Sequence, residues 1–157
     1  MGMYTKYKLD VELKAETPVV LLNYIRWLTN HLDAFHNNNV PELPNHPAVE
    51  NYRHSLVMCN FDDEMPYDEY PRELTQLENG NYRLQAAGNL KNYPEGTDWQ
   101  PIQGFLDMIL PHISDPVGSV IGWYEYEEWH KSCNIVYQGD KYSPLRIALD
   151  ADAIDYY

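Results

Sequence analysis

The sequence predicts a small α+β fold, because segments with the alternating pattern of strands enclose two segments with the periodicity of helices. The chain has 157 residues, a length typical of one domain, and we expect residues 1–157 to share a single core. Hydrophobic residues make up 44% of the chain and aromatic residues 13%. Burial of so much apolar surface offsets the conformational entropy lost on folding, which excludes general disorder.

The first strand is predicted at residues 7–13, YKLDVEL, where apolar and charged side chains alternate strictly. A helix follows, with Thr17 expected as the N-cap and Pro18 at the first helical position, where its missing N–H costs nothing. This helix is expected to end near Asn30. Its apolar stripe comprises Leu21, Tyr24, Ile25 and Leu28.

The middle of the chain is expected to supply two more strands. Residues 33–50 are rich in Asn and Pro without a period and predict a long surface connection. A short apolar run predicts a strand at 54–61, and an Asn79-Gly80 turn precedes another strand at about 82–91. If these strands pair, the acidic segment 62–73, DDEMPYDEYPRE, protrudes from their connection as an exposed loop.

A second helix and a hairpin are predicted in the last third of the chain. Thr97 and Gln100 match a capping box that begins the helix. The apolar stripe of this helix, interrupted near Pro111, comprises Ile102, Phe105, Leu106, Ile109 and Ile113. The hairpin is expected to pair a strand at 119–130 with one at 134–138.

The resulting order, β-α-β-β-α-β-β, matches the split β-α-β arrangement of ferredoxin-like folds with an extra C-terminal edge strand. We therefore expect an antiparallel sheet with both helices on one face and the other face open. In the strand at 119–130, alternation predicts two different sides. One side carries Trp123, Glu125, Glu127 and Trp129, and the other carries Gly122, Tyr124, Tyr126, Glu128 and His130.

Negative charge is concentrated in the second half of the chain. The net charge is −13, with 5 Lys or Arg against 6 Asp or Glu through residue 60 and 6 against 18 afterwards. Such a field repels nucleic acid and anionic membrane and attracts cationic proteins, so we expect a protein partner with a basic surface. Solubility alone is the simpler explanation of the same charge.

A candidate partner-binding surface combines the acidic segment with the aromatic and acidic hairpin, because exposed Trp beside carboxylates suits a basic partner. Its predicted residues are Asp62, Asp63, Glu64, Asp68, Glu69, Trp123, Glu125, Glu127, Glu128 and Trp129. The alternative is that the Tyr side of the strand packs beneath the second helix and that the glutamates form an ordinary solvated face.

No catalytic, cofactor or metal-binding motif is evident. The six histidines include no HExxH and no i, i+4 pair, and Cys59 and Cys133 have no metal-binding spacing. Two H-x-S triplets, at His112 and His130, are similar to those of two-histidine phosphoesterases, in which each histidine lies on a strand. A small enzyme of that type is the alternative to a binding protein, and a homo-oligomer formed through the open face or an edge strand is a third hypothesis.

The sequence has no run of eighteen apolar residues and does not begin with a basic segment followed by an apolar one, so we expect no membrane span, no signal peptide and a cytoplasmic location. Four segments, KLDVELKAETP, RLQAAGNLKNY, QGFLDMILPHI and GWYEYEEW, resemble small acidic proteins of unknown function encoded by bacteriophages and prophages. The likeness covers about two thirds of the chain, and NLKNY and YEYEEW carry it best. It implies action in a bacterial cytoplasm, and by analogy with small acidic phage proteins an inhibitor of host defence.

Overall fold

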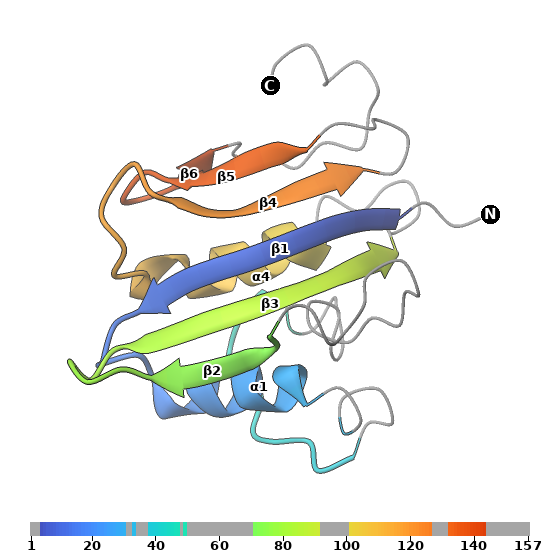
Figure 1. Cartoon of the computed structure of the whole chain (residues 1–157). Coiled ribbons are helices and arrows are strands. Elements are labelled where there is room, and N and C mark those ends of the chain that lie inside the picture. Colours follow the sequence, from blue (N-terminus) through green and yellow to red (C-terminus); the bar gives the residue numbers. More distant parts are fainter. Residues whose placement is uncertain are drawn as a thin grey trace.

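The computed structural model describes residues 4–30, 33, 38–47, 49, 71–91, 101–126 and 132–143. Their fold is mixed α+β, as the sequence predicted (Figure 1). The elements are β1 (Tyr4–Leu13), α1 (Val19–Thr29), β2 (Glu73–Gln76), β3 (Tyr82–Lys91), α4 (Pro101–Ile109), the 3-10 helix η1 (Leu110–His112), β4 (Val120–Tyr126), β5 (Cys133–Tyr137) and β6 (Tyr142–Ser143).

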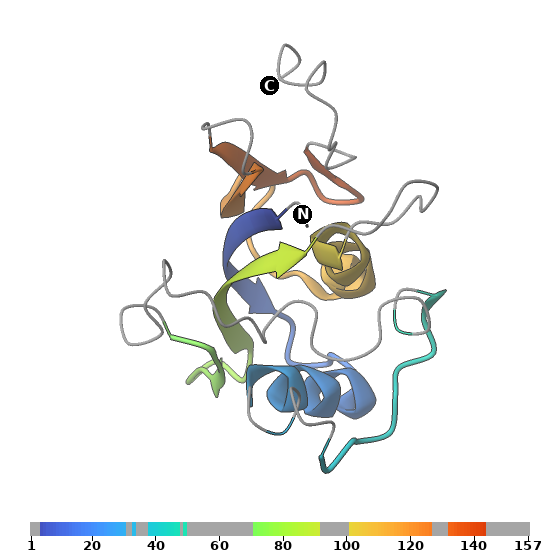
Figure 2. The ribbon, with the colours of Figure 1, turned by 90° about the vertical axis from the view of Figure 1, so that its right-hand side faces the viewer.

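The six strands form one antiparallel sheet in the order β2-β3-β1-β4-β5-β6. The first strand is central and pairs with β3 along its full length and with β4 over its first half. Figure 2 shows α1 and α4 on the same side of the curved sheet. The opposite side, which we call the helix-free face, carries neither of these helices.

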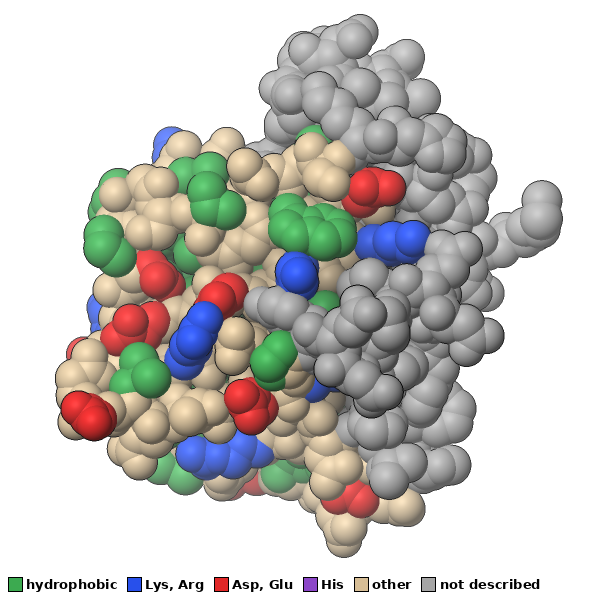
Figure 3. Space-filling model, in the orientation of Figure 1, with side chains coloured by type: hydrophobic (Ala, Val, Ile, Leu, Met, Phe, Trp, Pro, Cys, Tyr) green, Lys and Arg blue, Asp and Glu red, His purple; other side chains and the backbone are tan. Residues whose placement is uncertain are grey.

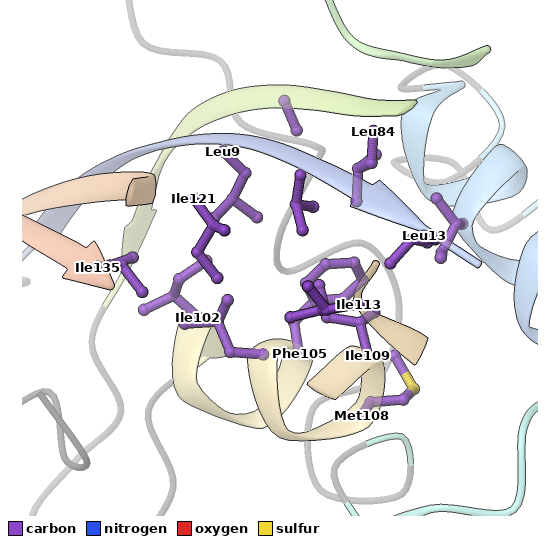
Figure 4. Packing of buried hydrophobic residues seen from close by; sticks show 14 of the residues in the cluster. Leu9, Leu13, Leu84, Ile102, Phe105, Met108, Ile109, Ile113, Ile121 and Ile135 are labelled. Atoms are coloured by element: carbon purple, nitrogen blue, oxygen red, sulfur yellow. The ribbon is translucent and has the colours of Figure 1, made fainter. Parts of the chain in front are cut away.

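The core lies between the sheet and the helices. Alternate residues of β1 are buried on this side, namely Tyr7, Leu9, Val11 and Leu13. The predicted stripes of both helices are also buried, and Figure 4 shows the α4 stripe packed against side chains of β1, β3, β4 and β5. Each such aliphatic side chain stabilises the fold by about 1.5–3 kcal/mol relative to an exposed one, so hydrophobic burial is what holds the helices to the sheet.

A β-bulge interrupts the alternation of β4. Val120 pairs with Val136 and Gly122 with Ile135, so two steps along β4 match one step along β5. Ile121 is the extra residue and is fully buried, as is Tyr124. The bulge therefore lets side chains with different parity enter the core from the same strand.

Two predictions about the start of α1 are wrong, namely Thr17 as its N-cap and Pro18 as its first helical residue. Thr17 is not the N-cap of α1: the cap residue is Pro18, while the Thr17 hydroxyl donates to the carbonyl oxygen of Lys14 at 2.6 Å. The structure also shows β2 beside β3, joined to it by the short turn at residues 77–81, whereas the predicted pairing of β3 with the segment 54–61 lies outside the described residues. That turn contains Gly80 with φ of 88°, as the Asn79-Gly80 pair predicted.

The C-terminal part of the sheet has one strand more than predicted, since β6 follows β5 at the edge. Other predictions, namely the strand at 54–61, the capping box at Thr97 and most of the acidic segment, lie outside the described residues. Residues 38–47 of the long connection run on the helix side of the sheet (Figure 2), where the Trp27 indole donates to the carbonyl oxygen of Asn38 at 2.7 Å. Among the described helices, none is long and apolar enough to cross a membrane.

Candidate functional site

Two of the ten predicted partner-binding residues, Trp123 and Glu125, are described by the structure, and both lie on the helix-free face. The register shows this directly, because they pair with Lys8 and Lys6, which alternate with the buried residues of β1. The others lie outside the described residues. Tyr124 is fully buried on the helix side, as the alternative interpretation of the hairpin expected.

Trp123 belongs to an apolar strip on the helix-free face. It pairs with Asn134 of β5, and Val136 lies two residues further along the same side of β5. Val136 in turn pairs with Val120, which is 56% exposed. We call Val120, Trp123 and Val136 the Trp123 strip. In Figure 3 hydrophobic side chains gather on this face over β4 and β5.

The strip exists because of the bulge in β4. Strict alternation would place Val120 on the same side as Tyr124, in the core, but the extra residue Ile121 reverses this parity. The sequence analysis missed Val120 and Val136 for that reason. The signal that points to them is Gly122, since a glycine within a strand pattern often marks a bulge.

Glu125 lies beside a hydroxyl donor and a cation on this face. Its carboxylate accepts a hydrogen bond from the Ser132 hydroxyl at 3.0 Å. Its cross-strand neighbour is Lys6, and directly opposed charges on neighbouring strands attract. Beside Trp123, the described end of the hairpin is therefore a polar rim with charges of both signs.

Along β1 the helix-free face changes sign. Lys6 and Lys8 stand at the beginning of the strand, and Asp10 and Glu12 stand at its end. Arg83 of β3 donates to both carboxylate oxygens of Asp10, at 2.9 and 2.7 Å, in an exposed bidentate pair. The described part of this face is thus mixed in charge, with a cationic and an anionic end.

A polar cluster lies at the anionic end of β1, and no sequence pattern predicted it. The Asp115 carboxylate accepts from the backbone N–H of Glu12 at 2.8 Å, and the Asn81 amide donates to the Glu12 carboxylate at 2.8 Å. Burial raises the pKa of Asp115, with a further increase from the nearby charges of Glu12 and Asp10 and an opposing effect of the Glu12 N–H. These contacts tie the end of β1 to the segment before β4 and have a structural role.

A second polar contact joins β6 to α4. The Tyr142 hydroxyl donates to the Asp107 carboxylate at 2.9 Å and lies 3.4 Å from the carbonyl oxygen of Gln103. Burial raises the pKa of Asp107, while the Tyr142 hydrogen bond and the charge of His46 lower it in part. Burial and the neighbouring Asp107 charge raise the pKa of Tyr142, so the hydroxyl stays protonated and acts as a donor.

His112, the first histidine of the phosphoesterase hypothesis, lies in η1 and not on a strand. Its carbonyl oxygen accepts from the Lys14 N–H at 2.7 Å, and burial together with the Lys14 charge lowers the pKa of its imidazole. This placement differs from the two-strand arrangement of that family, and His130 lies outside the described residues. The phosphoesterase hypothesis stays a prediction, which alanine replacement of both histidines would test.

The comparisons with known proteins are negative. No protein-family model matches the sequence, and no curated protein and no solved structure is significantly similar to it. Within the described ranges, no group of three or more His, Cys, Asp or Glu side chains could hold a metal ion.

Proposed function

We propose that this chain is a non-enzymatic accessory protein that acts by binding another protein through the helix-free face of its sheet. The observation that carries the proposal is the placement of Trp123. Trp123 is partly exposed on the same face as the paired residues Val120 and Val136, with polar Asn134 and Lys8 as its neighbours on the adjoining strands. A large aromatic side chain in an apolar strip with a polar rim is typical of the residues that dominate binding energy at protein interfaces.

The fold that presents this face is proposed to be a ferredoxin-like split β-α-β arrangement with two strands appended. The proposal is supported by the order β4-β1-β3-β2 of the first four strands, all antiparallel, and by the positions of α1 and α4 in the chain. In such a fold the helices cover one side of the sheet, and the other side is available for binding.

The proposed partner is a host protein with a basic surface. Support comes from the second half of the chain, in which 18 acidic residues face 6 Lys or Arg. The acidic residues Asp62, Asp63, Glu64, Asp68, Glu69, Glu127 and Glu128, together with Trp129, are proposed to extend the surface around Trp123 and Glu125. With the resemblance to phage and prophage proteins, this suggests an inhibitor of a host defence or nucleic-acid-binding protein in the bacterial cytoplasm.

A pull-down from bacterial lysate tests this function. The immobilised chain is expected to capture a partner at an ionic strength of about 0.01 M and to lose most of it at about 1 M, because the Debye length falls from about 30 Å to about 3 Å. Equal capture at both would contradict a partner recognised through its basic charge. Capture of nothing at either ionic strength would contradict the proposal as a whole.

A further inference from the structure

The row of β1 side chains on the helix-free face has a charge pattern that is complementary to itself. On β1 the side chains on this face change from cationic, Lys6 and Lys8, to anionic, Asp10 and Glu12. On the neighbouring strands Arg83 pairs with Asp10 and Glu125 lies opposite Lys6, so this order of signs belongs to the β1 row alone. A row with cations first and anions last repels a copy placed in the same direction and attracts a copy placed in the reverse direction. Charge complementarity therefore favours a second copy of this chain as an occupant of the face.

A two-fold axis defines which residues of the two copies would meet. For two sheets packed face to face at about 10 Å, consider a two-fold axis that runs between them, perpendicular to the strands, at the level of Leu9. Each strand then lies over the same strand of the second copy in the reverse direction. Lys8 of one copy meets Asp10 of the other, and Lys6 meets Glu12.

The same operation pairs the apolar residues. Trp123 is on the level of Lys8, and the Val120–Val136 pair is displaced from it along the strands in the direction of Asp10. The axis that places Lys8 over Asp10 therefore places Trp123 over Val120 and Val136 of the second copy. A single two-fold axis therefore brings together opposite charges on β1 and apolar side chains on β4 and β5.

We infer that the helix-free face mediates a two-fold homodimer in which Trp123 of each copy packs on Val120 and Val136 of the other. The inference rests on the proposed function, because it takes the same face to be a protein-binding surface. When no host partner is bound, a second copy of the chain occupies this face. A host partner that binds Trp123 then competes with the second copy, so dimerisation lowers the concentration of the free binding surface.

Sedimentation of the purified 157-residue chain tests the inference. The wild type is expected to be a dimer at micromolar concentration, and Val120→Asp is expected to weaken its Kd by about tenfold or more, because it places a charge beneath the indole. Val19→Asp is the matched control: Val19 is 68% exposed at the start of α1, on the other side of the sheet, and this variant is expected to dimerise normally.

Reversal of the charge at Lys8 or at Asp10 tests the position of the two-fold axis. Lys8→Glu and Asp10→Lys each place like charges opposite one another in the homodimer and are expected to be monomeric at a concentration where the wild type dimerises. An equimolar mixture of the two variants restores both attractive pairs and is expected to give a heterodimer. Circular dichroism establishes that each variant is folded.

Three results would overturn the inference: a monomeric wild type, a dimer that Val120→Asp leaves intact, or folded charge variants that do not recover association on mixing. Because the purified chain contains no host protein, none of these results depends on the lysate pull-down. A monomer that still captures a host partner refutes the dimer and leaves the proposed function standing, whereas a dimer that captures nothing contradicts the proposed function and leaves the dimer standing.

Discussion

Gly122 shows how a single residue without a side chain determines the course of β4. It faces the helices opposite Leu9, and a Cβ at this position would collide with the backbone oxygen of Lys8 and lie 2.9 Å from a methyl carbon of Leu9. The glycine therefore allows β4 to approach β1 closely at the bulge. The sequence shows a glycine within a strand pattern, but not the close approach that requires it, because that distance depends on the pairing of strands more than a hundred residues apart.

Replacement of Gly122 by alanine is expected to lower the free energy of unfolding by about 1–3 kcal/mol, since the backbone must shift to accommodate the methyl group. Asn134→Ala, an exposed change on the neighbouring strand, is the control and should have an effect within about 0.5 kcal/mol. Urea unfolding measures both. A Gly122→Ala protein as stable as the control would show that β4 and β1 are not so close.

The helices and the long strands are the elements that the sequence predicts best. Alternation along β1 and the periodicity of α1 and α4 correctly identify their buried residues, because one face of each element must enter the core. The short strands β2 and β6 are not predicted, since two to four residues carry too little pattern. The alternation along β4 therefore predicts the face on which Trp123 lies. It does not predict that Val120 and Val136 share this face, because their placement depends on the bulge.

The contact between β6 and α4 predicts a dependence of stability on pH. The folded state raises the pKa of Asp107 above its ordinary value of 3.8, so the folded protein binds the proton more tightly than the unfolded chain. The corresponding stabilisation is complete below pH 3.8 and is lost as the pH rises through the raised pKa.

Asp107→Asn is expected to remove this contribution while keeping an acceptor for the Tyr142 hydroxyl. Relative to the wild type, the variant should therefore gain stability as the pH increases from about 3.8 to neutrality. Thermal unfolding of the two proteins across this range measures the difference. A constant difference at every pH would mean that Asp107 ionises equally in the folded and unfolded chains.

At the scale of the whole molecule, the sheet has two sides with different roles. One side is closed by α1 and α4 around a core of aliphatic and aromatic side chains, and the other carries charges of both signs and the Trp123 strip. The sequence correctly places the acid in the second half of the chain, but it does not show that the cations of β1 lie beside the hairpin. Cross-strand neighbours such as Lys6 and Glu125 become visible only when the register is known.

The most direct test of the account compares partner binding by Trp123→Ala with that by the wild type. Because Trp123 lies on the helix-free face and not in the core, the variant should fold with a stability close to that of the wild type and lose its captured partner in the lysate pull-down. Val19→Ala, on α1, is the control and should retain the partner. A folded Trp123→Ala protein that captures the same partner as strongly as the wild type would contradict the claim that the helix-free face is the binding surface.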